Sequence, residues 1–143
     1  MSPSLLQVSI IVDDPGAVVG FYCALFEAQE EHTVNPEGYR GVVLSGGIIG
    51  FNEPAARGKL GLSGSTHVAE RSSHDQGYFT VKVDEDGEVD QLIKKAMNLG
   101  ATLLKGPLTT PFNWYIAVLR DPHGIAFRLA STRGPIRPRR SVD

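Results

Sequence analysis

The chain has 143 residues, of which 41% are hydrophobic and 21% charged, a composition typical of one soluble globular domain with a single core. Its formal net charge of -2 gives no general attraction to nucleic acid or to an anionic membrane. The single cysteine, Cys23, excludes an intrachain disulfide and a cysteine-built metal site. With no signal-like N-terminus and no apolar run near the ~20 residues of a membrane span, we predict a cytoplasmic protein.

The first predicted element is a strand at residues 8–12, because apolar side chains alternate along this stretch. Asp14 and Pro15 follow as a helix N-cap and a first helical residue. The apolar stripe of the helix, expected at about 15–27, consists of Val18, Phe21, Tyr22, Leu25 and Phe26. The chain therefore opens with a strand and an amphipathic helix.

The same strand and helix recur in the second half of the chain. Alternating apolar residues predict a strand at 79–83, and a second apolar stripe predicts a helix at about 88–99. Corresponding positions differ by 71 residues, as do Val8 and Phe79, and this offset is close to half the chain length. Because one offset holds through strand, turn and helix, we interpret the pattern as an internal duplication.

Three further strands are predicted after each helix. They are expected at 30–34, 39–44 and 48–52 in the first half and at 102–105, 114–120 and 125–130 in the second. A hairpin turn is predicted at 45–47 and another turn at 121–124.

The two units, at about 5–53 and 78–131, form a single predicted domain over residues 1–131. The connection at 54–77 is long enough to predict a functional or mobile loop. We expect the Arg- and Pro-rich tail at 132–143 to be disordered, and the alternative of a nucleic-acid-binding arm lacks an interleaved aromatic residue.

Two βαβββ units in tandem resemble the vicinal oxygen chelate superfamily, which includes glyoxalases, extradiol dioxygenases and proteins that confer resistance to fosfomycin and bleomycin. The resemblance covers about residues 5–131 and is carried by SIIVDDPGAVVGFYCALF, FTVKVDEDGEVDQLIKKAMNLGA and WYIAVLRDPHGIAFRLA. It implies an α+β fold in which helices cover the convex sides of curved sheets and the concave sides form a cup for a ligand. The same fold hosts lyases, dioxygenases, transferases and plain binding proteins, so function depends on the residues in the cup.

Strand alternation predicts which side chains face that cup. Val8, Val81 and Phe127 are expected to pack against the helices, while their neighbours along each strand point the other way. Aromatic residues at strand ends suit a planar ligand, although core or interface packing is an alternative role for them. The predicted ligand-binding residues are Gln7, Ser9, Phe51, Tyr78, Lys82, Trp114 and Arg128.

In the metalloenzymes that the chain resembles, metal ligands lie near the start of the first strand and in the last strand of each unit. Carried over to this sequence, these places fall on Gln7, Gly50, Tyr78 and Arg128. Glycine has no side chain, a protonated phenol is a poor ligand and an arginine cannot ligate a cation. The four histidines, for example His123 in a predicted turn, do not complete such a set, so we predict no metal and no cofactor.

Arg128 offers a planar fork for a carboxylate, a phosphate or an enolate-like oxygen. Its alternative role is an intramolecular ion pair, for which Glu53, Glu70 and Asp75 are the candidate partners. Our leading hypothesis is a metal-free member of the superfamily that binds a small anionic or aromatic molecule, in the manner of bleomycin-resistance proteins. The alternatives are a metal-dependent glyoxalase-like lyase or dioxygenase, and a metal-independent enzyme that uses Arg128, Lys82 and Tyr78.

The resemblance also implies a homodimer, because single two-unit chains of this superfamily commonly pair so that one subunit completes the cup of the other. Apolar strand residues such as Ile48, Ile49 and Val118 add a weaker reason, since they need to be covered. We expect no nucleic-acid or membrane partner. Cys23, within the first helix, is interpreted as a small helix residue rather than a nucleophile.

Overall fold

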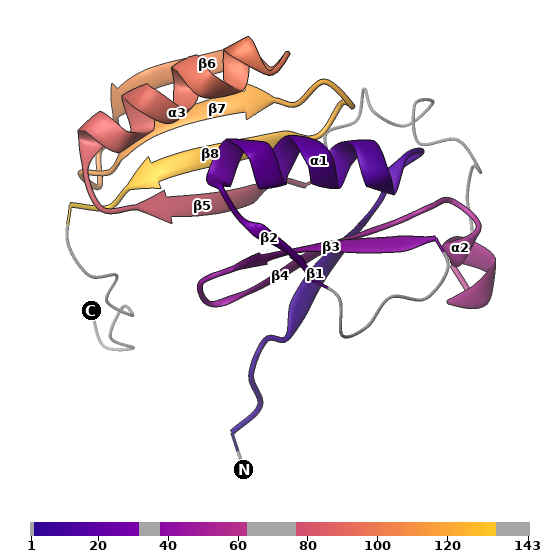
Figure 1. The fold of residues 1–143 in the computed structure, drawn as a ribbon. Helices are drawn as coiled ribbons and strands as arrows, with labels where there is room; N and C mark the ends of the chain where they lie inside the picture. Colours follow the sequence, from indigo (N-terminus) through magenta and orange to yellow (C-terminus); the bar gives the residue numbers. More distant parts are fainter. Residues whose placement is uncertain (1, 32–37, 63–76, 134–143) are drawn as a thin grey trace. The chain divides into compact units, whose positions relative to one another are not determined.

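The computed structural model describes residues 2–31, 38–62 and 77–133 of the chain, which divides into two compact units, Met1–Asp75 and Gln76–Asp143. Each unit contains a four-stranded mixed sheet with a helix on one face (Figure 1). The strand order is β1-β4-β3-β2 in the first sheet and β5-β8-β7-β6 in the second. The repeated order confirms the α+β class and the duplicated βαβββ unit.

The first unit begins with β1 (Gln7–Ile11), which runs parallel to β4 (Gly47–Asn52). Antiparallel pairing then adds β3 (Tyr39–Leu44) and β2 (Gln29–Glu31). Between β1 and β2 lies α1 (Pro15–Phe26), which begins as predicted because the Asp14 carboxylate accepts a hydrogen bond from the Ala17 backbone N–H at 3.1 Å.

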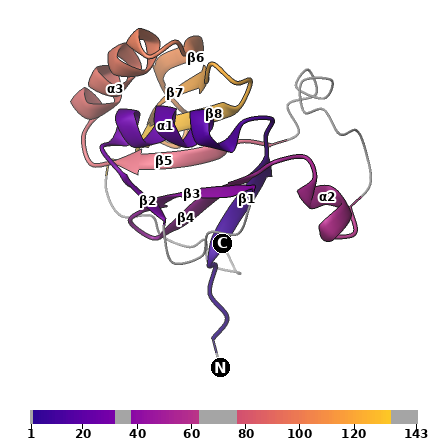
Figure 2. The same ribbon diagram turned by 45° about the vertical axis from the view of Figure 1, so that its right-hand side comes forward.

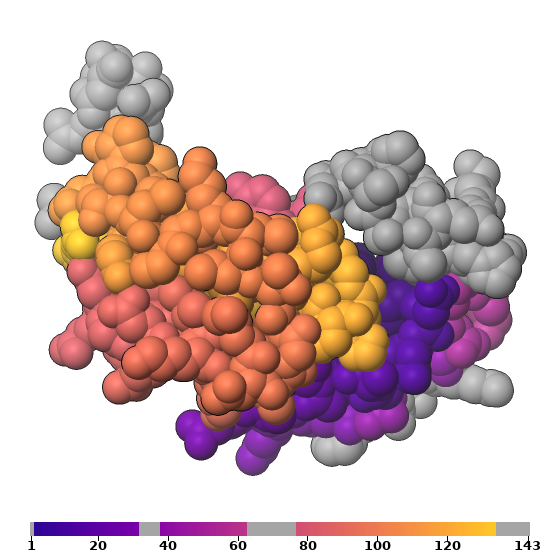
Figure 3. All heavy atoms as spheres, turned by 90° about the horizontal axis from the view of Figure 1, so that it is seen from above, coloured from indigo at the N-terminus to yellow at the C-terminus, as the bar shows by residue number. Residues whose placement is uncertain are grey.

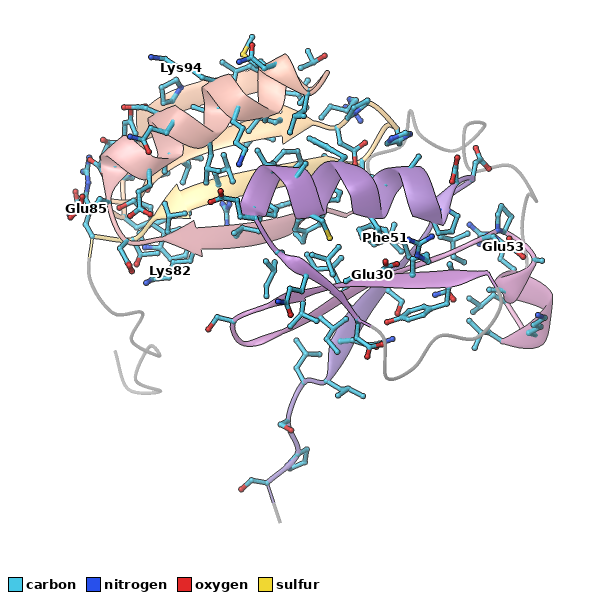
Figure 4. The ribbon with its side chains drawn as sticks, in the orientation of Figure 1. Glu30, Phe51, Glu53, Lys82, Glu85 and Lys94 are labelled. Atoms are coloured by element: carbon cyan, nitrogen blue, oxygen red, sulfur yellow. The ribbon has the colours of Figure 1, made fainter. Side chains whose placement is uncertain are left out.

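Packing of α1 against its sheet forms the core of the first unit. Tyr22 of α1 stacks on Phe51 of β4 with ring centroids 5.7 Å apart, and both side chains are fully buried. Figure 4 shows Phe51 beneath α1. Our prediction that Phe51 lies near the rim and faces a ligand is therefore wrong. Phe51 pairs with Ile10 and Arg40 across the sheet, and this register places its side chain on the helix-covered face.

The second unit repeats this plan with β5 (Phe79–Val83) parallel to β8 (Ala126–Ser131). Next come β7 (Tyr115–Arg120) and, at the edge, β6 (Thr102–Thr109), while α3 (Asp86–Asn98) covers one face (Figure 2). The core is formed by residues of α3 and the facing strands, namely Val89, Ile93, Ala96, Leu119, Phe127 and Leu129. From the side of α3, the second unit presents the side chains of α3 and β6 (Figure 3).

The predicted turn at 121–124 is held by one carboxylate. Asp121 Oδ1 accepts hydrogen bonds from the backbone N–H groups of His123 at 2.7 Å and Ile125 at 3.0 Å. Gly124 has a φ of 96°, a left-handed conformation that glycine adopts without steric cost. This turn sets the antiparallel register of β7 and β8 and thereby the position of Arg128.

Several element bounds differ from the predicted ones. The strand β6 extends past the predicted end at residue 105, because register shifts let an edge strand accommodate Gly106 and Pro107. A one-turn helix, α2 (Ala56–Lys59), lies in the connection for which no regular structure was predicted. Part of the strand predicted at 30–34, most of the loop at 54–77 and most of the tail at 132–143 lie outside the described residues.

The second sheet confirms the predicted burial for Phe127, whereas Val81 on the edge strand β5 is only half-buried, and in the first sheet Val8 departs from the prediction. Phe127 is fully buried on the side of α3. Val8 shares a face with Ile49, its partner in β4, yet 46% of Val8 is exposed. Because β1 is an edge strand, α1 contacts mainly β3 and β4 and leaves Val8 uncovered by the helix.

Among the described residues, no helix combines the length and the hydrophobicity that crossing a membrane would require.

Candidate functional site

Arg128 lies on the face of the second sheet opposite α3, between two aromatic rings. Its Cζ atom is 5.4 Å from the centroid of the Tyr78 ring and 5.5 Å from that of Trp114. Both separations are within the range of a favourable cation–π interaction. Arg128 Nε also donates a hydrogen bond to Thr80 Oγ1 at 3.1 Å. We call these four residues, Tyr78, Thr80, Trp114 and Arg128, the arginine cage.

The sheet register brings the cage together. Thr80 of β5 is directly opposite Arg128 of β8 in the parallel ladder, so both side chains leave the same face. Tyr78 lies two residues before Thr80 and shares that face. At the other end, Trp114 precedes β7, and its backbone N–H donates to Thr110 Oγ1 at 3.0 Å. The ring of Phe112 packs edge-on against Trp114 with centroids 5.0 Å apart.

The arginine cage leaves most of the guanidinium donors available. A guanidinium has five N–H donors, and among the described residues only Thr80 accepts one from Arg128. No ion pair of Arg128 occurs within the described ranges, and two of the predicted partners, Glu70 and Asp75, lie outside them. A stacked guanidinium keeps its N–H groups in the plane of the fork, where they suit a bidentate oxyanion.

Lys82 lies two residues beyond Thr80 on the same face of the second sheet. Its ammonium is 3.7 Å from a carboxylate oxygen of Asp84, whose side chain is 90% exposed. Exposed ion pairs of this kind contribute little, so Asp84 neutralises Lys82 only weakly. Lys82 therefore supplies a second cation on the face that carries the arginine cage.

In the first unit the corresponding face is filled by Tyr39. Its phenol donates a hydrogen bond to Gln7 Oε1 at 3.3 Å, and Gln7 Nε2 donates to Ser9 Oγ at 2.9 Å. A Cβ atom added at Gly50 would come within 2.6 Å of Tyr39 Cε2, and one at Gly41 within 2.8 Å of the phenol oxygen. Burial, together with the negative charge of Glu31, raises the pKa of Tyr39 above its ordinary value, so the phenol stays protonated.

The two units therefore differ at one equivalent position. Ser9 pairs with Gly50 in the first sheet as Thr80 pairs with Arg128 in the second, and both pairs are parallel. The first unit has a glycine covered by an aromatic ring at this place, whereas the second has a cation held between aromatic rings. Only the second unit presents a side chain there for binding an anion.

The residues at the metal positions that the resemblance implies do not fit a metal ion. Gln7 uses its amide oxygen for Tyr39, and the space that a side chain at Gly50 would need is occupied by the same tyrosine. Arg128 places a permanent cation at the remaining last-strand position. No group of three or more His, Cys, Asp or Glu side chains in the described parts of the chain is arranged to hold a metal.

Two residues of these faces were missing from the predicted set. Thr80 was assigned to the correct face by strand alternation, but only the register with β8 shows that it accepts a hydrogen bond from Arg128. Tyr39 reads as an ordinary strand residue, and its role depends on two glycines, Gly41 and Gly50, lying beside it in the sheet. No signal in the sequence reveals that contact.

Comparisons with known proteins agree with the fold. The sequence matches the family model of the glyoxalase-like domain over residues 7–130. It is 31% identical to a glyoxalase/bleomycin resistance protein/dioxygenase family enzyme from Burkholderia phytofirmans PsJN, whose structure superposes with a TM-score of 0.80 over 91% of this chain and 99% of that one. No protein with a curated functional description matches the sequence.

Other solved structures share the fold at lower identity. A lactoylglutathione lyase from Agrobacterium tumefaciens is 18% identical with a TM-score of 0.68, over 92% of this chain and 95% of that one. The fosfomycin resistance protein FosX from Listeria monocytogenes is 17% identical with a TM-score of 0.64, over 92% and 94%. The chain belongs to the glyoxalase-like family of the vicinal oxygen chelate superfamily, as its repeated βαβββ units predicted.

Proposed function

We propose that this protein binds a small anionic molecule with a planar, unsaturated part on the face of the second sheet that carries the arginine cage, without a metal ion. The observation that supports the proposal is the position of Arg128 between Tyr78 and Trp114, with Thr80 as its one acceptor among the described residues. The guanidinium receives the anionic group, and the exposed Tyr78 and the Trp114 ring supply flat apolar area for the rest of the ligand.

The permanent positive charge of Arg128 supports binding without a metal ion. A permanent cation at position 128 repels a divalent ion, and it also takes the place of one as the fixed positive charge that receives an oxyanion. Gln7 and Ser9, predicted to touch the ligand, belong to the face that Tyr39 fills, and they are not needed for this proposal.

A thermal-shift screen of aromatic and other organic anions tests the proposal, because a ligand that binds the folded state raises the melting temperature by mass action. For any hit, we expect Arg128→Ala to weaken binding by about ten- to a hundredfold, as loss of a charge-assisted hydrogen bond does. Lys94→Ala is the matched control, since Lys94 lies on α3 and its loss changes the net charge equally. Unchanged affinity in Arg128→Ala, together with a large fall in melting temperature, would make Arg128 a structural residue.

Elemental analysis of protein purified without an affinity tag tests the absence of a metal. Stoichiometric zinc, nickel, manganese or iron would contradict the proposal and favour a metal-dependent lyase or dioxygenase of the same fold.

We further propose that the chain forms a homodimer. Large apolar side chains of the first unit support this proposal, because Leu5, Leu6 and Val43 are 74%, 73% and 42% exposed. Ile49, one of the residues that the sequence offered as a reason, is 9% exposed and needs no partner. Light scattering at micromolar concentration should give twice the monomer mass of 15.4 kDa, and a value of one monomer mass would refute the dimer.

A further inference from the structure

The cations of the second sheet are all placed on one face. Each strand contributes one of them, namely Lys82, Lys105, Arg120 and Arg128, and no strand of this sheet contains Asp or Glu. Val118 pairs with Arg128 on one side and with Lys105 on the other, which puts these residues on a common face. Arg120 and Lys82, each two residues along its strand from a member of that face, share it.

The described acidic residues of the second unit lie elsewhere. Asp86, Glu88 and Asp90 belong to α3, which packs on the opposite face, and Asp84 and Glu85 precede that helix. Asp121 is buried in the turn before β8 and accepts backbone hydrogen bonds there. The face opposite α3 therefore carries an excess of positive charge, with Asp84 as its one acidic contact among the described residues, and such an excess raises the local concentration of anions there.

Arg128 and Lys82 are the two cations of this face best placed to act together. They lie on neighbouring strands with a two-residue offset, so the strand spacing and rise put their Cα atoms roughly 8 Å apart. Arg120 donates to the backbone carbonyl of Gly124 at 3.1 Å, and Lys105 lies on the edge strand β6. Figure 4 shows Lys82 on β5 directed away from α3, whereas Lys94 extends from α3 itself.

The first sheet has no comparable excess of cations. Its described strands contain Glu30, Glu31 and Arg40, and Arg40 is paired with Glu30. Because the first sheet lacks an excess of cations and Tyr39 fills its equivalent face, we expect one anion-binding face per chain.

We propose that the ligand is a dianion with two acidic groups, of which one is bound by Arg128 and the other by Lys82. This inference rests on the proposed function and adds the number and spacing of the negative groups. A monoanion bound at Arg128 leaves the Lys82 ammonium with the exposed Asp84 as its one counter-charge in the described part of the chain. A second acidic group on the ligand replaces that weak pair with a contact inside the cationic face.

Two aromatic carboxylates that differ by one acidic group provide the test, namely benzoate and benzene-1,3-dicarboxylate, with affinities measured by calorimetry at fixed salt. We expect the dicarboxylate to bind the wild-type protein about fivefold more tightly than benzoate, with one molecule per chain, as an added contact to a half-exposed cation would give. In Lys82→Met this preference should disappear, while Lys94→Met, which removes the same charge from α3, should retain it.

A gain-of-affinity variant gives a second readout. Asp84→Asn removes the counter-charge of Lys82 and should strengthen binding of the dicarboxylate by about twofold, with little change for benzoate. Equal affinities for the two compounds in the wild type, or equal effects of Lys82→Met and Lys94→Met, would overturn the dianion inference alone. If neither compound binds at millimolar concentration, or if Arg128→Ala leaves both affinities unchanged, the proposed function itself fails.

Discussion

The ring of Tyr39 lies over Gly50, so closely that a Cβ atom at position 50 would come within 2.6 Å of Tyr39 Cε2. The phenol of the same tyrosine reaches across the sheet to Gln7. One aromatic side chain thus occupies the place from which a metal ligand of the first unit would project in related metalloenzymes. In this chain the packing of Tyr39 therefore requires a residue without a side chain at position 50, and the same glycine removes a potential metal ligand.

Gly50→Ala should therefore destabilise the protein. The added methyl group must displace a buried ring, and overpacking of this kind costs about 1–3 kcal/mol. Gly20→Ala is the matched control, because a Cβ atom there meets nothing within 4 Å and alanine is the better helix former, so about 0.5–1 kcal/mol of stabilisation is expected. Urea unfolding monitored by circular dichroism measures both. A Gly50→Ala variant as stable as the wild type would show that Tyr39 moves aside easily.

Thr80→Val should weaken binding of an anion without unfolding the protein. Valine keeps the branched shape that suits a strand but removes the hydroxyl that accepts from Arg128 Nε. Loss of this one hydrogen bond should lower the affinity about three- to tenfold, because the guanidinium is no longer held in position. Thr80→Ser, which keeps the hydroxyl, should restore most of the affinity. A loss of affinity in Thr80→Ser but not in Thr80→Val would instead indicate a packing role for the threonine methyl group.

Arg128→Glu should abolish binding of the anion and yet fail to create a metal site. Within the second unit the new carboxylate would lie beside Tyr78, whose protonated phenol is a poor ligand. One carboxylate is too few ligands for tight binding of a divalent ion. Calorimetric titration with zinc or manganese, beside wild type as control, measures this. Submicromolar metal binding by Arg128→Glu would mean that other residues complete a site.

Arg133→Ala should raise the pKa of Asp86 toward its ordinary value. The Arg133 guanidinium donates to both carboxylate oxygens of Asp86, at distances from 2.7 to 3.2 Å, and these hydrogen bonds lower the pKa of Asp86. A depressed carboxyl pKa stabilises the fold above the pKa of the unfolded chain, and that contribution is lost as the pH falls through the folded-state value. Side-chain NMR titration measures the pKa directly.

Stability at acidic pH provides the control for that titration. The wild type should have a higher melting temperature than Arg133→Ala at neutral pH. This difference in melting temperature should shrink as the pH falls and Asp86 becomes protonated. A constant difference at every pH would show that Arg133 acts through its contacts with Thr109, Asn113 and the Tyr115 ring instead.

The sequence was sufficient to predict the repeated strand-helix unit, because apolar periodicity reports directly on which face of an element is buried. The constant offset, seen for example between Val8 and Phe79, predicted two units of the same plan, and the two sheets do have the same strand order. Positions marked by strong local signals, such as Asp14 at the start of α1 and the turn at Asp121, were correct because each depends on hydrogen bonds within a few residues. Alternation likewise placed Arg128 and Lys82 on the face opposite the helix.

Contacts between strands were decided by the tertiary structure. The sequence predicted that Phe51 faces the ligand, whereas the register of β4 places its ring against Tyr22. A shift of one residue in register reverses the face of every side chain in a strand, so the face depends on the pairing. Trp114 and Tyr78 are far apart in the sequence, and only the pairing of β5, β8 and β7 brings both rings to one guanidinium. Periodicity determines the face of each strand, whereas the partners on that face depend on strand order and register, which involve residues distant along the chain.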